Sequence, residues 1–176
     1  MDQRQLTAYH EAGHEMAADE LGVVTAGIVS IVPNPDDETL GRMASEVQTF
    51  PWKSGYSPEE DAAFREVMFH DAVINYAGHA ALVALLGAED MSEDCAARHG
   101  AGQDWANAEK ALGGDAARME SAKARAIDIV KARRVHIEHL ARMLCDGNGT
   151  VDMNDFWKAR RMIEGPPKMR FTIPPL

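Results

Sequence analysis

The sequence predicts an α+β protein that is mainly helical, with a small β-hairpin or sheet beside its first helix. Two observations support this fold class. Long segments carry apolar residues at helical spacing, and two β-rich segments, residues 24–33 and 41–49, flank a turn rich in Pro and Asp. With 176 residues and 45% hydrophobic content, the chain can bury one substantial core. We expect one domain over residues 1–164 and a Pro-rich tail over residues 165–176.

The first half of the chain should contain two helices, one before the hairpin in the sequence and one after it. We expect the first to run from about Gln3 to Leu21 and to end before Gly22. Residues 57–60, Ser-Pro-Glu-Glu, combine an N-cap, a proline at the first helical position and a capping-box glutamate. This combination predicts the start of a long helix that continues towards Leu86.

The second half should be helical almost throughout. A helix is expected after Gly102, and Asp115 should open the longest helix, which keeps an apolar face through Leu144. A last short helix should span residues 154–163. Residues 146–155 carry oxygen ligands around a glycine, as a calcium loop does. Leu144 stands where the first carboxylate would be needed, however, so a helix-connecting turn is the preferred interpretation.

Charge, cysteine use and hydropathy exclude several classes of function. The formal net charge of −10 disfavours nonspecific nucleic-acid binding, which needs clustered Lys and Arg. Cys95 and Cys145 form neither a C-x-x-C pattern nor a disulfide framework, as is typical of a reducing cytosol. No run approaches about 18 apolar residues, so no membrane span is expected. These observations together favour a cytoplasmic protein.

The segment Tyr9-His10-Glu11-Ala12-Gly13-His14 is the most informative part of the chain. Residues four positions apart lie on one helical face, so His10 and His14 can bind one Zn²⁺ ion through their imidazole nitrogens. Glu11, one position along, can then accept a proton from water at the metal. A catalytic zinc needs a third protein ligand and an open position, so a distant His, Asp or Glu must complete the site. Five side chains qualify: His70, His79, His99, Asp104 and Glu109.

The order of several motifs resembles the peptidase domain of the FtsH family of ATP-dependent zinc metalloproteases. Residues 7–14 resemble the zinc helix of that family, and residues 28–33 with 40–43 resemble its small hairpin beside the active site. Residues 73–81 resemble its Gly-Gly-Arg-Ala-Ala helix, and residues 100–104 resemble the segment that carries its third zinc ligand. The resemblance implies His10, His14 and Asp104 as the zinc ligands and Glu11 as the general base. The alternative for Asp104 is a helix N-cap.

The chain departs from the family pattern beside the expected site. Ala77 replaces the first Gly and His79 the Arg, and Leu82 stands where the family has a glutamate soon after Ala-Ala. These changes predict weaker support for the ligands by neighbouring side chains, and the loss of such support typically costs about 10–100-fold in metal affinity or activity. Iron, nickel and cobalt accept the same kinds of ligand, so Zn²⁺ is a preference.

The resemblance implies a zinc-dependent endopeptidase that acts on unfolded or flexible polypeptides. Full-length family members also carry membrane segments and an ATPase module, whereas no G-x-x-x-x-G-K-[ST] loop occurs in these 176 residues. A separate ATPase partner would therefore be needed to unfold folded substrates. One alternative is a catalytically silent zinc-binding adaptor, with His79 or His99 as a fourth ligand. Another is a helical binding module without metal. The sequence leaves the oligomeric state open.

Overall fold

The structure is a computed structural model, which describes residues 2–33, 42–45 and 57–164. Its elements in chain order are α1 (Gln3–Glu20), β1 (Thr25–Ser30), β2 (Arg42–Ser45), α2 (Pro58–Ala81), the π-helix η1 (Leu82–Leu86), α3 (Glu93–Arg98), α4 (Gly102–Leu112), α5 (Ala116–Ala132), α6 (Arg134–Asp146), β3 (Thr150–Asp152) and α7 (Met153–Glu164). The fold is α+β and mainly helical, as the sequence predicted.

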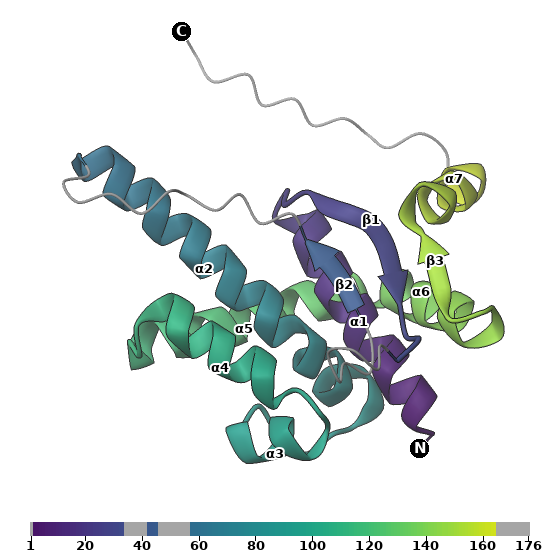
Figure 1. Ribbon diagram of the computed structural model, residues 1–176, viewed down its shortest axis with the longest axis horizontal. Helices are drawn as coiled ribbons and strands as arrows, with labels where there is room; N and C mark the ends of the chain where they lie inside the picture. The colour runs from purple at the N-terminus through teal and green to yellow at the C-terminus, as the bar shows by residue number, and fades with distance from the viewer. Residues whose placement is uncertain (1, 34–41, 46–56, 165–176) are drawn as a thin grey trace, which may run out of the picture.

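Helices α4, α5 and α6 pack against the pair formed by α1 and α2, whereas α3 packs on α4 and α7 on the sheet (Figure 1). Helix α2 contacts α1, α4 and α5, while α1 also contacts α6 and the sheet. Small side chains allow the two central helices to approach closely. A Cβ atom on Gly13 would lie 2.5 Å from the carbonyl oxygen of Ala77, so this position of α1 tolerates only glycine without a shift of one helix.

The small sheet has three strands in the order β2-β1-β3, with both pairs antiparallel. The pairing of β1 with β2 confirms the predicted hairpin, and its turn lies outside the described residues. Strand β3 was not predicted. It is only three residues long, and Val151 between exposed Thr150 and Asp152 is its one buried side chain. A strand this short leaves too little alternation in the sequence to be recognised.

The prediction of one long helix after Asp115 is wrong, because two helices occupy that segment. Helix α5 ends at Ala132, α6 begins at Arg134, and the longest helix is α2. No Gly or Pro marks the break. The Arg133 side chain instead reaches the end of α1, where it pairs with Asp19 at 3.1 Å and Glu20 at 2.7 Å. The break between α5 and α6 therefore coincides with ion pairs to α1, and no residue pattern around Arg133 predicts it.

The predicted helix boundaries otherwise agree closely with the structure. Ser57 caps α2 through a reciprocal capping box with Glu60, and α1 ends one residue before the predicted boundary. Helix α3, six residues long, was not predicted. The Pro-rich tail lies outside the described residues.

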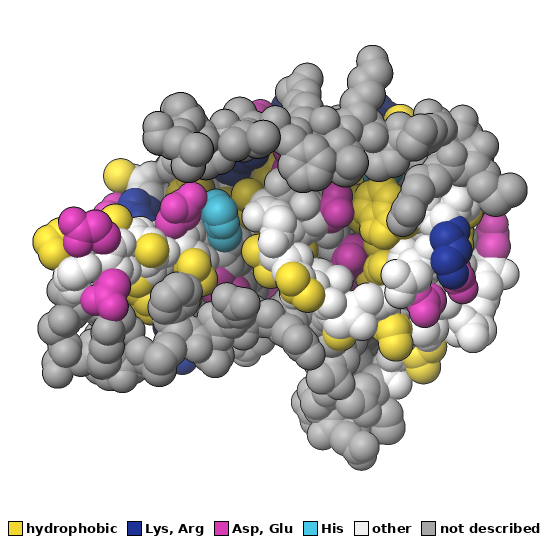
Figure 2. Space-filling model, turned by 90° about the horizontal axis from the view of Figure 1, so that it is seen from above, with side chains coloured by type: hydrophobic (Ala, Val, Ile, Leu, Met, Phe, Trp, Pro, Cys, Tyr) yellow, Lys and Arg dark blue, Asp and Glu magenta, His cyan; other side chains and the backbone are white. Residues whose placement is uncertain are grey.

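None of the described helices is long and apolar enough to cross a membrane. Figure 2 shows acidic and hydrophobic side chains interspersed over the described part of one face, where Lys and Arg side chains do not gather into a patch.

Candidate metal centre

Three side chains from two distant parts of the sequence meet where α1 lies close to the start of α4. Helix α1 supplies His10 and His14, and the first turn of α4 supplies Asp104. The Nε2 atoms of the two histidines are 2.9 Å apart, and Asp104 Oδ2 lies 2.9 Å from His10 Nε2 and 3.4 Å from His14 Nε2. Their three ligand atoms thus surround one point, and they form a group that could hold a metal ion.

The backbone of α2 fixes the orientation of His14. Its Nδ1 lies 2.7 Å from the carbonyl oxygen of Ile74, which can only accept, so Nδ1 carries the hydrogen. In the neutral ring the Nε2 lone pair then faces His10 and Asp104. A hydrogen bond of this kind is the usual way in which a protein orients a metal-binding histidine. His10 lacks an equivalent: its buried Nδ1 has no hydrogen-bond partner among the described residues.

Gly78 of α2 leaves the space that the two imidazoles occupy. A Cβ atom at this position would lie 2.5 Å from His14 Nε2 and 2.6 Å from His10 Cε1. No real side chain tolerates such contacts. This glycine lies in the segment that resembles the Gly-Gly-Arg-Ala-Ala helix, where the preceding residue is Ala77. The structure thus gives Gly78 a steric role directly beside the two imidazoles.

The charges of the three side chains are strongly coupled. Burial alone lowers the pKa of His14, but the charge and hydrogen bond of Asp104, the charge of Glu11 and the Ile74 carbonyl raise this pKa to about 9. Burial raises the pKa of Asp104, but His14 and His10 outweigh it and hold this pKa well below its usual range. Without metal, a proton shared among these groups therefore balances the buried carboxylate.

Glu11 is buried on the same helix, with 7% of its surface exposed. Its charge contributes to the raised pKa of His14, which shows that the two groups interact electrostatically. Asp104, with 27% of its side chain exposed, is the most accessible of the three possible ligands.

The structure distinguishes Asp104 from the other candidates for third ligand. Asp104 is the third residue of α4 and does not cap it; Ala101 stands at the cap. His79 instead donates from Nε2 to the carbonyl oxygen of Asp90, and His99 contacts Cys95. Glu109 is exposed. Neither His79 nor His99 belongs to the His10–His14–Asp104 group among the described residues.

The structure shows what the replacement of the expected glutamate by Leu82 changes. Leu82 is fully buried at the start of η1 and packs in the core, so no carboxylate enters from this position. His79 is also buried, and burial lowers its pKa, with His99 and His10 adding to the effect. The cluster nevertheless fits a zinc ion. Two imidazole nitrogens and one carboxylate oxygen are groups of the kinds that zinc binds, and Gly78 adds no side-chain bulk beside them.

Other sequence features have structural roles. Trp105 is buried in the core, and the partly buried Trp157 packs against the core. Trp52 lies outside the described residues. His136 and His139 are half-buried on α6. In the segment that resembles a calcium loop, Asn148 and Asp152 accept hydrogen bonds from the backbone N–H groups of Thr150 and Asn154. These are turn and cap interactions, as preferred from the sequence.

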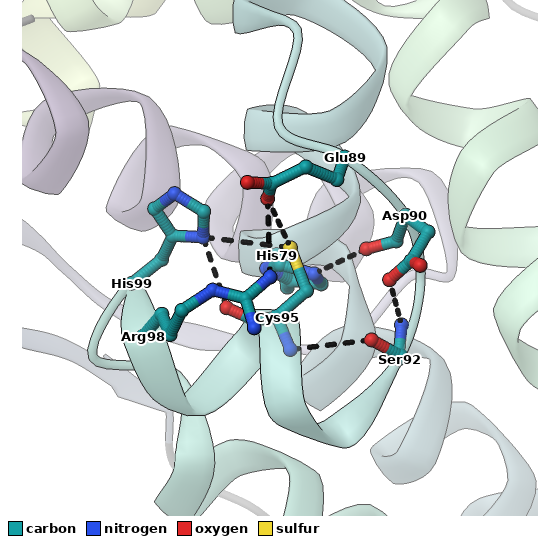
Figure 3. Close-up of polar contacts among 7 residues, drawn as sticks. All are labelled: His79, Glu89, Asp90, Ser92, Cys95, Arg98 and His99. Carbon is teal, nitrogen blue, oxygen red and sulfur yellow. Dashed lines mark hydrogen bonds and ion pairs between the residues drawn. The ribbon is translucent and has the colours of Figure 1, made fainter.

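A second group of possible ligands was missed by sequence reasoning. Glu89, Cys95 and His99 bring a carboxylate, a thiol and an imidazole together around α3 (Figure 3). The spacing of Cys95 and His99, four residues apart on a helical turn, was the available signal. The third member precedes the helix and could not be assigned from spacing.

No protein-family model matches this sequence, and a search of curated proteins finds no match. Membership of the FtsH-like peptidases therefore stays a prediction from the motifs. Any function has to be argued from the geometry of His10, Glu11, His14 and Asp104.

Proposed function

We propose that this chain is an FtsH-like zinc endopeptidase that hydrolyses peptide bonds of unfolded or flexible polypeptides. The observation that carries the proposal is the convergence of Asp104 with His10 and His14, although 94 positions separate Asp104 from His10. A lone His pair on a helix could arise by chance. A carboxylate delivered to both imidazoles from a distant helix provides the third ligand that a catalytic zinc site requires.

His10, His14 and Asp104 would hold the ion. Bound zinc would supply a Lewis acid that makes water acidic enough to lose a proton near neutral pH. The task of Glu11 is to take that proton and to pass it to the leaving amine, as general acid–base catalysis requires. The Ile74 carbonyl keeps His14 in the tautomer that can ligate, because it occupies the other ring nitrogen.

The sheet offers a means of holding an extended substrate. Among the described residues, β2 pairs only with β1 and forms an edge of the sheet, and both strands contact α1, which carries the motif. An edge strand can pair with a peptide through its backbone, which gives affinity with little dependence on sequence. Broad specificity for unfolded chains follows. A separate ATPase partner would extend such activity to folded substrates in the cytoplasm.

A catalytically silent zinc-binding adaptor is the alternative, and two observations favour it. Leu82 supplies no carboxylate, and His10 Nδ1 has no partner among the described residues. The missing carboxylate and the missing hydrogen bond would both leave the ligands in place but less firmly oriented.

The decisive experiment compares wild type with Glu11→Gln in metal content and in cleavage of unfolded casein and a peptide library. The amide keeps the size of the side chain but cannot accept a proton. We expect unchanged metal and an activity loss of at least about 10²–10⁴-fold. Glu109→Gln, an exposed change on α4, is the matched control and should behave as wild type. Wild-type protein that binds zinc and cleaves nothing would support the adaptor. Full activity in Glu11→Gln would refute the assigned base.

A further inference from the structure

We propose that Glu89, Cys95 and His99 form a second metal site, for Zn²⁺ or a similar divalent cation that binds thiolate. Their ligand atoms all lie within 4.8 Å of one another. Cys95 Sγ is 3.1 Å from Glu89 Oε2 and 3.6 Å from His99 Nδ1. These separations are close to those between ligands of one tetrahedral ion, given metal–ligand bonds of about 2.0–2.3 Å.

The side chains belong to a tightly connected corner of the fold (Figure 3). Ser92 caps α3 by accepting from the Cys95 backbone N–H, and Asp90 Oδ1 accepts from the Ser92 N–H. The carbonyl oxygen of Asp90 is held by His79 of α2. The loop before α3 is therefore tied to the central helix, which holds Glu89 beside the helix that carries Cys95.

The surroundings of Cys95 are those of a ligand. A buried, free cysteine usually behaves as a small hydrophobic side chain. The Cys95 side chain is fully buried, yet its sulfur contacts a carboxylate and an imidazole. Thiolate, imidazole and carboxylate are the three kinds of side-chain ligand that zinc uses. Glu89 is exposed and His99 is half-buried, so two of the three ligands are open to solvent although the sulfur is covered.

Binding would replace interactions that are weak or easily exchanged. Glu89 pairs with Arg98 at 3.4 Å, but both side chains are more than half exposed, and such surface pairs contribute little stability. His99 Nδ1 donates to the Cys95 carbonyl oxygen at 2.9 Å, so the ring must adopt its other tautomer to ligate through this atom. In the metal-free protein the Cys95 thiol donates a hydrogen bond to Glu89. On binding, this thiol proton would leave to solvent, because zinc binds the thiolate.

The second site would stabilise the segment that positions Asp104. Helix α3 packs on α4, and only five positions separate His99 from Asp104. Between them Gly100 adopts a positive φ of 82°, and the Ala101 N–H donates to the Ala96 carbonyl oxygen at 2.8 Å. An ion bound across the loop, α3 and its end would resist movement of this turn. The assignment of the second site does not depend on the proposed peptidase function.

Cobalt titration tests the proposal, because a thiolate ligand to Co²⁺ gives an intense near-ultraviolet charge-transfer band. His10, His14 and Asp104 contain no sulfur, so the band reports the second site alone. After removal of metal by a chelator under a phosphine reductant, we expect wild type to bind about two Co²⁺ ions and to show the band. His14→Ala should lose one ion and keep the band. Cys95→Ser and His99→Ala should each lose one ion and the band.

Two further variants complete the experiment. Cys145→Ser, which changes the other cysteine, should retain both ions and the band. Glu89→Gln should weaken Co²⁺ binding at the site of Cys95 and His99. In Cys95→Ser the site of His10, His14 and Asp104 should bind Co²⁺ about 10-fold more weakly, because Asp104 is held less firmly. Wild-type protein without the band at saturating Co²⁺, or a band that disappears in Cys145→Ser, would overturn the proposal. The first of these two results does not require any variant to fold.

Discussion

Gly78→Ala should abolish tight metal binding although it removes no ligand. The added Cβ atom would lie 2.5 Å from His14 Nε2 and 2.6 Å from His10 Cε1, whereas ordinary contact begins at 3.4 Å. The imidazoles would therefore have to move by about 1 Å, and a tight-packed core does not absorb such a shift elsewhere. Metal sites tolerate deviations of only about 0.2 Å in ligand distance. The predicted displacement exceeds this several-fold.

The same substitution should have a modest effect on stability. Alanine is favoured over glycine in a helix by about 1 kcal/mol, while overpacking a core typically costs about 1–3 kcal/mol. We therefore expect the free energy of unfolding of the metal-free protein to fall by roughly 0–2 kcal/mol. Urea denaturation with excess chelator measures this quantity, and Zn²⁺ competition with a chromophoric chelator measures the affinity.

Gly102→Ala is the matched control. Gly102 is also helical and lies two residues from Asp104, but its Cβ atom would meet Ala97 at an ordinary 3.7 Å. This variant should bind metal as wild type does. If Gly78→Ala bound zinc with wild-type affinity, the steric account of the site would be refuted, and with it the position of the ligands.

The other predictions concern the third ligand and a buried carboxyl beside the site. Asp104→Ala should lose one metal ion, whereas His70→Ala should keep the wild-type content; the reverse result in elemental analysis would show that the third ligand is misassigned. Burial raises the pKa of Glu15 from its ordinary 4.5 to about 7, so between these values the folded protein binds more protons than the unfolded chain. Stability should therefore fall as the pH rises through this window. Glu15→Gln, which can keep the hydrogen bond from Thr25, should make this slope smaller and stabilise the metal-free protein near pH 8 by up to about 3 kcal/mol. The raised pKa of His14 adds the same fall in stability to both proteins, so the difference between them reports Glu15. Urea unfolding of both proteins at pH 5 and pH 8 checks the change, and equal slopes would contradict it.

Local signals determined much of the secondary structure. The capping box at Ser57 and the hairpin segments depend on neighbours in the sequence, so they could be read without the fold. The break at Arg133 could not, because its ion pairs to Asp19 and Glu20 join segments more than a hundred residues apart. Strand β3 was missed for a related reason: it is defined by pairing with β1 and has little pattern of its own.

The candidate site divides in the same way. The sequence by itself placed His10, Glu11 and His14 on one helix, since a spacing of four residues fixes a common face whatever surrounds it. It could name Asp104 only through the resemblance to a family, with His70, His79, His99 and Glu109 left as competitors. Only the tertiary structure shows which of them lies beside His10 and His14, because the packing of α2 against α1 and α4 sets which side chains converge. That packing also gave Gly78 and the Ile74 carbonyl their roles and assembled Glu89, Cys95 and His99, since contacts between distant segments have no periodic signature in a single chain.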